Sequence, residues 1–153
     1  MYYTKESLPK ELAVEQLWSI SEAAYDHGSP WSVNQFKSDL DQKTSNYLVL
    51  AEEQWIGFIS YQLVLDEAEL THVVIHKKFQ HQGCGSQLID QVIQRLRKQG
   101  VTQLFLEVRE SNVSAKNLYE KKGFKIINRR KNYYRLPSED GIVMCLKLKE
   151  VKQ

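Results

Sequence analysis

The chain has 153 residues, of which 42% are hydrophobic and 26% are charged, which is typical of one soluble domain that buries its own core. No apolar stretch approaches the roughly 20 residues that span a membrane, and residues 1–6 lack the basic and apolar regions of a signal peptide. The only two cysteines, Cys84 and Cys145, have no metal-ligand spacing, so we expect a reduced cytoplasmic protein without disulfide or metal.

Charge is divided unevenly along the chain. Residues 1–75 hold 4 Lys/Arg and 12 Asp/Glu, a balance of −8, whereas residues 76–153 hold 17 Lys/Arg and 7 Asp/Glu, a balance of +10. The basic half favours an anionic ligand, and the acidic half either suits a cationic substrate or is a solvated surface. Because the net charge is only +2 and the basic residues follow no nucleic-acid-binding motif, nucleic acid is not expected as the primary ligand.

The first half of the chain predicts a short strand, two helices and three further strands. Residues 1–4 are expected to form an edge strand, and apolar residues recur at helical spacing from Leu8 to Tyr25. Residues 27–30, His-Gly-Ser-Pro, interrupt this helix. Residues 32–35 fit a capping box that begins a second helix ending near Leu40. The next strands are expected at residues 47–51, 55–64 and 66–75, the last two antiparallel.

A glycine-rich loop, residues 80–85 (Gln-His-Gln-Gly-Cys-Gly), joins the buried strand Leu70 to Ile75 to a long amphipathic helix that ends at Gly100. Two glycines where a helix begins let the backbone approach a ligand and leave the first helical N–H groups free, which makes an anion site from main chain. The loop lacks the Lys-Ser/Thr of a P-loop and the third glycine of the dinucleotide fingerprint. We therefore expect a phosphate-bearing ligand that is neither a nucleoside triphosphate nor NAD.

After this helix the chain predicts a strand, a helix and two more strands. The strand covers residues 102–109, and Ser111-Asn112 cap a helix that runs through Lys122 and ends at Gly123. The last two strands, residues 124–134 and 141–149, are separated by a loop at 136–140. The order β-α-α-β-β-β-α-β-α-β-β predicts a mixed α/β fold with one crossover helix between two parallel strands. We expect residues 1–153 to form a single domain.

Three residues are candidates for chemistry: one near the end of the strand at residues 102–109, and two on the helix that follows it. Strand alternation puts Glu107 opposite the apolar face, where it is either paired with Arg109 or a lysine, or serves as a general base at a cleft. Asn112 either caps the helix or turns its amide toward a ligand. Leu118 is predicted to face the core, whereas Tyr119, about 100° further round, is either a packed aromatic or a phenol that donates to a leaving group.

These motifs together resemble the GCN5-related N-acetyltransferase (GNAT) superfamily. Gln80, Gly83 and Gly85 meet its general signature, Gln/Arg-x-x-Gly-x-Gly/Ala. A narrower resemblance, to the ribosomal-protein-alanine N-acetyltransferase (RimI) family, covers nearly the whole chain. It rests on residues 106–124 (Leu-Glu-Val-Arg-x-Ser-Asn-x-x-Ala-x-x-Leu-Tyr-x-x-x-Gly-Phe), 130–134 (Arg-x-Asn-Tyr-Tyr), Met144, and 30–36 (Pro-Trp-Ser-x-x-x-Phe). The second set of motifs is more selective than the glycine motif.

The resemblance implies a GNAT fold and transfer of an acetyl group from acetyl-CoA to the N-terminal alanine of small-subunit ribosomal protein 18. It implies Glu107 as general base and Tyr119 as general acid, and it implies that Trp31, Tyr133 and Tyr134 line the groove for the protein N-terminus. The cofactor would be bound by Val73, Val74, Ile75, Gln80, His81, Gln82, Gly83, Cys84, Gly85, Ser86, Asn112 and Lys116. The enzyme is expected to be a monomer.

Three histidines depart from what is usual in the family. His72 either lines the cleft and tunes Glu107 or has no part in it, and His76 is expected to be an exposed loop residue. His81 either donates near a phosphate or is simply solvent-exposed. Cys84 is expected to be a small buried thiol without a covalent role.

Two other functions fit the same motifs. One is acetyl transfer to a small-molecule amine, such as a polyamine or an aminoglycoside. The other is a non-catalytic acyl-CoA-binding module, against which the presence of both Glu107 and Tyr119 argues.

Overall fold

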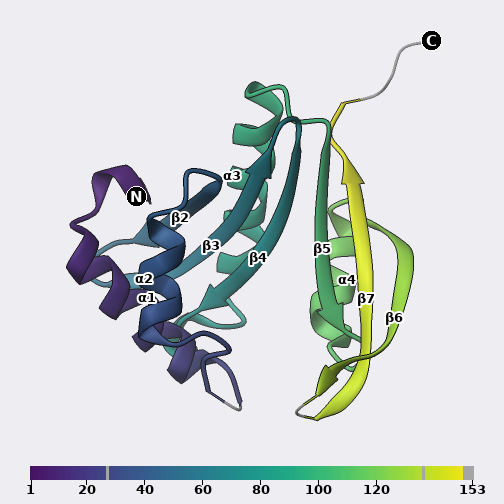
Figure 1. Ribbon diagram of the computed structural model, residues 1–153, viewed down its shortest axis with the longest axis horizontal. Helices are drawn as coiled ribbons and strands as arrows, with labels where there is room; N and C mark the ends of the chain where they lie inside the picture. Colours follow the sequence, from purple (N-terminus) through teal and green to yellow (C-terminus); the bar gives the residue numbers. More distant parts are fainter. Residues whose placement is uncertain (27, 136, 150–153) are drawn as a thin grey trace.

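The computed structural model describes residues 1–26, 28–135 and 137–149; His27 of the predicted helix break, Leu136 of the predicted loop and residues 150–153 lie outside the described residues. Within these ranges, seven strands and four α-helices follow one another in the predicted order (Figure 1). Their bounds are β1 Tyr2–Thr4, α1 Lys10–Ala24, α2 Val33–Leu40, β2 Ser45–Ala51, β3 Trp55–Val64, β4 Glu67–Ile75, α3 Cys84–Lys98, β5 Gln103–Arg109, α4 Val113–Lys121, β6 Lys125–Arg135 and β7 Ser138–Lys147.

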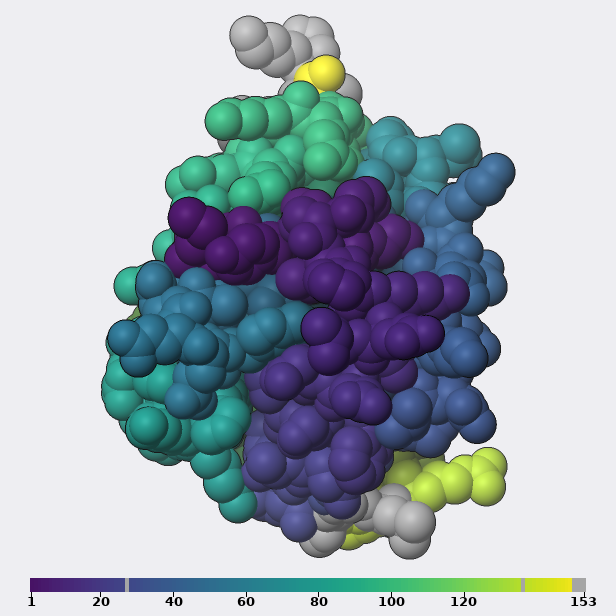
Figure 2. Space-filling view, turned by 90° about the vertical axis from the view of Figure 1, so that its left-hand side faces the viewer, coloured from purple at the N-terminus to yellow at the C-terminus, as the bar shows by residue number. Residues whose placement is uncertain are grey.

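The two N-terminal helices begin within two residues of their predicted starts. α1 buries an apolar stripe that includes Val14 and Leu17. α2 begins at the predicted capping box, in which Ser32 Oγ accepts from the N–H of Gln35 at 3.2 Å and Gln35 Oε1 accepts from the N–H of Ser32 at 2.8 Å. Figure 2 shows this side of the molecule, with the N-terminal segment and α1 in purple across its centre and α2 in blue beside them.

One seven-stranded sheet has the strand order β1-β2-β3-β4-β5-β7-β6. Its neighbouring strands are antiparallel except β4 and β5, which are parallel and joined through α3, the predicted crossover helix. The pairing between these two strands covers only Glu67–Glu69 against Gln103–Phe105. Beyond that point they diverge, as Figure 1 shows, so the rest of β4 has a strand partner only in β3.

Apolar side chains cover both faces of the sheet. On one face α3 and α4 pack through a cluster that includes Leu88 and Leu104. On the other face α1 and α2 pack through a cluster that includes Phe36 and Phe58. Each cluster buries large side chains almost completely, which is the arrangement expected of helices on both sides of a mixed sheet.

A β-bulge in β4 decides which face its side chains point to. Tyr61 pairs with Leu70 but Ser60 pairs with His72, which leaves Thr71 as the extra residue. Strict alternation from Leu70 would send His72 and Val74 toward α3. Val74 packs instead in the core under α1 and α2, and the ring of His72 contacts Phe36 of α2.

One predicted detail is wrong. The loop predicted at residues 136–140 is shorter, because β7 already begins at Ser138 and pairs there with Arg135. Leu118 packs against the core as predicted but is only half-buried, and its neighbour Tyr119 is more deeply buried, with 8% of its surface exposed. No helix in the described ranges is both long and apolar enough to cross a membrane.

Gly57 on β3 lies where packing against β4 leaves no room for a side chain. A Cβ there would lie 2.5 Å from the carbonyl oxygen of Val74 and 2.7 Å from Cδ1 of Ile75. We expect Gly57→Ala to lower the free energy of unfolding by about 2–3 kcal/mol, measured by urea denaturation, because β4 must shift to accept the methyl group.

Gly85→Ala is the matched control. Its Cβ would meet only Cγ1 of Ile75, at 3.7 Å, and the residue lies inside α3. Its free energy of unfolding should change by less than about 1 kcal/mol, in the stabilising direction. Equal losses in the two variants would contradict the packing argument.

Candidate active site

The glycine loop presents the start of α3 as the sequence predicts. Gly83 is the N-cap residue with φ +84°, a conformation that side chains disfavour, and Cys84 is the first helical residue. The loop is tied to β4 and the turn after it: Gln80 Nε2 donates to the carbonyl of Ile75 at 3.0 Å, and Gln82 Nε2 to that of Lys78 at 3.3 Å. The first N–H groups of α3 have no acceptor within the helix and are available to an anion.

Gly85 lies in the first turn of α3. The protein itself leaves ordinary van der Waals room for a Cβ at this position, so its own packing does not require a glycine there. A bare backbone next to the free N–H groups instead suits the close approach of a phosphate. His81 is exposed, with φ +64°, and Ser86 and the Cys84 thiol are half-buried.

The three β4 residues predicted to bind the cofactor are placed differently from one another. Val73 and Ile75 are half-buried and pack toward α3, on the side of the glycine loop. Val74 is 2% exposed and its side chain belongs to the core under α1 and α2. Only its backbone can therefore contact a ligand held between β4 and β5.

Glu107 on β5 is a nearly buried carboxylate whose partner differs from the two predicted alternatives. Its Oε1 lies 3.2 Å from Nε of Arg130 on β6, and its side chain is 14% exposed. Arg109 instead binds Glu139 at 3.0 Å and the carbonyl of Pro137 at 2.9 Å. Burial raises the pKa of Glu107 above its usual range, and Arg130 opposes that shift. A carboxyl group whose pKa is raised in this way is suited to accept a proton near neutral pH.

Tyr119 lies on α4 and packs against Phe124, with 5.6 Å between ring centroids. Burial raises its pKa, with smaller contributions from Tyr25 and Tyr134, so it stays a protonated phenol at neutral pH. Tyr134 also interacts electrostatically with Glu107. Tyr119 is thus a packed aromatic residue whose hydroxyl is protonated at neutral pH.

The other two α4 candidates lie at the start of that helix. Asn112 caps it, since its Oδ1 accepts from the N–H of Ala115 at 3.1 Å. That cap does not use Nδ2. Lys116, one turn further along, is half-buried.

The aromatic residues predicted to bind the substrate form two groups. Tyr133 and Tyr134 are in edge contact, 5.2 Å between centroids, beside the Glu107–Arg130 pair. Trp31 lies at the start of α2 and lines a shallow hollow of about 410 Å³ together with Asn34, Gln35, Ser38, Asp39 and Gln42. Among the described residues no ring contact joins Trp31 to the two tyrosines.

His72 supports Trp31 and does not tune Glu107. Its ring meets that of Trp31 edge-on at 4.5 Å, and its Nδ1 hydrogen-bonds Ser60 Oγ at 2.8 Å. The side chain is 4% exposed, and burial lowers its pKa to about 4. His72 is therefore a neutral core residue that holds the wall of the hollow. His76 is half-buried, and its Nδ1 accepts from the N–H of Lys78 at 3.1 Å.

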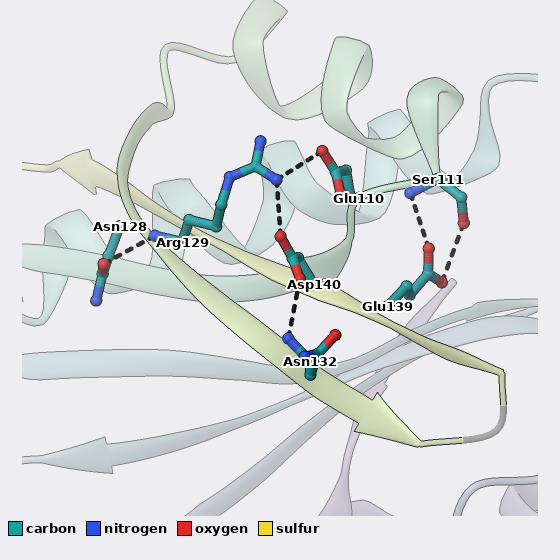
Figure 3. Close-up of polar contacts among 7 residues, drawn as sticks. All are labelled: Glu110, Ser111, Asn128, Arg129, Asn132, Glu139 and Asp140. Carbon is teal, nitrogen blue, oxygen red and sulfur yellow. Dashed lines mark hydrogen bonds and ion pairs between the residues drawn. The ribbon is translucent and has the colours of Figure 1, made fainter.

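One ion pair of Arg129 attaches the β6–β7 hairpin to the residue after β5, and a second closes the hairpin itself (Figure 3). Arg129 on β6 donates to Glu110 at 2.7 Å and to Asp140 at 2.9 Å. Asp140 also accepts from the N–H of Asn132 at 2.9 Å. These contacts hold the segment that carries Tyr133 and Tyr134 beside β5.

Three residues that lie around Glu107 were assigned no function from the sequence: Arg130, Glu69 and Gly141. Arg130 belongs to the 130–134 motif, but its approach to Glu107 depends on the pairing of β6 with β7 and of β7 with β5, which alternation along one strand does not predict. Within the described ranges no group of three or more His, Cys, Asp or Glu side chains is placed to hold a metal ion.

Comparison with known proteins agrees with this geometry. Residues 11–124 match the model of the acetyltransferase (GNAT) family. The chain is similar to the [ribosomal protein bS18]-alanine N-acetyltransferases of Haemophilus influenzae, with 42% identity over 86% of this chain and 90% of that protein, and of Escherichia coli K12, with 38% identity over 78% and 82%. The crystal structure of the ribosomal-protein-S18-alanine N-acetyltransferase from Escherichia coli superposes with a TM-score of 0.85 at 32% identity, covering 100% of this chain and 97% of that one.

The buried His72 makes stability depend on pH. Its folded-state pKa of about 4 lies below the ordinary value of 6.5, so the unfolded chain binds the extra proton between these values. We expect the free energy of unfolding to fall as the pH drops from 6.5 to 4, by up to about 3 kcal/mol from this residue. In His72→Asn, urea denaturation across this range should show a shallower fall. His81→Asn, which changes an exposed histidine, should keep the slope of the original protein; a His72→Asn slope equal to that of the original protein would contradict this account.

Proposed function

Because the chain belongs to the acetyltransferase (GNAT) family, we propose that it transfers the acetyl group of acetyl-CoA to the N-terminal alanine of ribosomal protein bS18. The observation that supports this substrate is the similarity, at 37–42% identity over most of both chains, to proteins named for that reaction. The intact set of Glu107, Tyr119, Tyr133 and Tyr134 around one end of β5 is consistent with it.

Family membership makes the chain an acyltransferase that uses acetyl-CoA. The N–H groups at the start of α3 would hold the pyrophosphate, and the β4 backbone that lacks a partner in β5 would receive the pantetheine arm. Asn112 and Lys116, at the start of α4, would contact the pantetheine arm from the side of β5. Acetyl-CoA supplies the thioester that the amine attacks.

Glu107 would act as the general base. An α-ammonium group has a pKa of about 8, so a carboxylate needs to do only modest work to take its proton, directly or through water. The pKa of Glu107, raised by burial, brings its basicity closer to that of the amine. The nearby exposed carboxylate of Glu69 adds negative charge that suits a cationic substrate.

Tyr119 would act as the general acid. Its buried hydroxyl keeps its proton at neutral pH and can donate it to a departing thiolate, whose pKa is about 8.5 if it behaves like cysteine. Burial makes this phenol a weaker acid than it is in water, but the same low-polarity surroundings also raise the proton affinity of the departing thiolate, so the proton can still pass to it. Tyr133 and Trp31 would line the path of the protein N-terminus.

Removal of the acid or the base should slow turnover without loss of the cofactor. We expect Glu107→Gln and Tyr119→Phe each to lower kcat by about 10²–10⁴-fold, since each removes one proton transfer, while acetyl-CoA affinity, measured by calorimetry, stays within about threefold. Glu53→Gln and Tyr2→Phe, which lie away from the site in the β2–β3 turn and on β1, should retain normal kcat. Normal turnover in both site variants would show that the catalytic assignment is wrong.

The substrate can be tested in cells with mass spectrometry of the small ribosomal subunit proteins. Deletion of the gene should leave one protein, bS18, lighter by one acetyl group, and the original chain should restore that mass while Glu107→Gln should not. A deletion that changes no ribosomal protein, together with ready acetylation of a polyamine or an aminoglycoside in vitro, would favour a small-molecule substrate. Acetyl-CoA binding without transfer to any amine would favour a non-catalytic binding module.

A further inference from the structure

Arg130 on β6 binds the carboxylate that the proposed reaction uses as its base. Its Nε lies 3.2 Å from Oε1 of Glu107, and its guanidinium lies over the ring of Tyr133, 5.1 Å from the centroid. The Arg130 side chain is 55% exposed, whereas that of Glu107 is 14% exposed. The cation therefore reaches a nearly buried carboxylate from the solvent side.

The second oxygen of this carboxylate has no donor. Oε2 of Glu107 is buried and makes no hydrogen bond among the described residues. It lies against the backbone of β7, where a Cβ on Gly141 would be 3.3 Å away. A buried carboxylate oxygen without a donor is costly and needs an explanation. One oxygen of Glu107 thus binds Arg130, and the other is enclosed by the protein without a donor.

The remaining charges around Glu107 make Arg130 important for its ionisation. Burial favours the neutral acid, and so does the negative charge of Glu69 on β4. The hydroxyl of Tyr134 on β6 also interacts with Glu107, and Arg109 on β5 lies 4.3 Å over the ring of Tyr134 and binds Glu139. Of the groups that act on Glu107, Arg130 is the cation that opposes protonation.

The fold orients Arg130 for this contact. Arg130 pairs with Gly141 and Tyr134 pairs with Glu139, so the three residues between them form a bulge in β6. Within it Asn132 has φ +53° and donates its N–H to Asp140, as Figure 3 shows. The bulge is therefore anchored, and Tyr133 within it stacks on the Arg130 guanidinium, which limits the freedom of that side chain.

We propose that Arg130 is a positioning residue for Glu107: its guanidinium binds Oε1 from the solvent side and holds the carboxylate ionised and oriented to accept the proton of the attacking amine. This inference rests on the proposed function, since it assigns the proton acceptor in that reaction. The proton passes from the amine nitrogen, directly or through one water, to the Glu107 carboxylate, and Arg130 keeps its own proton throughout.

The direct test follows the Glu107 carboxyl group by NMR and needs no substrate. The protein is labelled with ¹³C at the glutamate carboxyl carbons, and the Glu107 signal is identified by its loss in Glu107→Gln. In Arg130→Gln the titration midpoint of that signal should rise by about 0.5–1 pH unit, the lower end of the effect of one opposite charge because Arg130 is partly exposed. Arg130→Lys should restore at least half of the difference. Arg135→Gln, which removes an exposed cation from the same strand, should leave the midpoint unchanged.

Turnover supplies a second measurement. With saturating substrates, the acid limb of the kcat–pH profile of Arg130→Gln should move to higher pH by the same amount as the NMR midpoint, with kcat recovering above that limb. A merely structural role would lower kcat by a constant factor at every pH. Thermal unfolding of each variant shows whether it is folded at the pH values used.

The two measurements separate the inference from the proposed function. An unchanged NMR midpoint in folded Arg130→Gln overturns the inference whatever the substrate is. If the midpoint moves as expected but bS18 peptide is not acetylated, the role of Arg130 toward Glu107 stands, the substrate assignment fails, and the kcat profile is measured with the amine that is accepted. A moved midpoint with a pH-independent loss of kcat overturns the proton-acceptor part of the proposal.

Discussion

The parting of β4 from β5 is the constraint on which the site depends. Two parallel strands inside one sheet would normally pair along their length, but here pairing stops after Glu69 and Phe105. The bulge at Thr71 contributes, because an extra residue bends a strand and increases its twist. The result is a stretch of β4 backbone, running directly into the glycine loop, whose side toward β5 has no strand partner.

The two faces of the sheet beside the diverging strands carry different sets of candidate groups. The face under α3 and α4 carries the anion-binding start of α3 and the half-buried side chains of Val73 and Ile75. The face under α1 and α2 carries His72, Phe36 and the Trp31 wall. The start of α3 and the hollow beside Trp31 therefore lie on opposite faces of the sheet.

The electrostatic surroundings of Glu107 are locally unfavourable, and the proposed role of Glu107 as a base explains why. A carboxylate is nearly buried, one oxygen lacks a donor, and a neighbouring carboxylate repels it. The electrostatic cost is limited by Arg130. The arrangement is held by the β6–β7 hairpin, in which Asp140 binds Arg129 and Asn132, and which Arg129 attaches to Glu110 directly after β5. Such locally unfavourable electrostatics in an otherwise well-packed domain are typical of a functional site.

Much of this protein can be predicted from its sequence because the signals are local. The order of helices and strands, the capping box at Ser32, the glycine N-cap of α3 and the position of Glu107 opposite the apolar face of β5 all follow from periodicity, caps and turns within a few residues. The tertiary structure decided what depends on residues distant in the chain: the bulge that turns His72 into the core, the deeper burial of Tyr119 than of Leu118, and the pairing of Glu107 with Arg130. These could not be read from sequence, because the register of paired strands and the approach of charges from different strands are set by packing between elements, which leaves no local pattern.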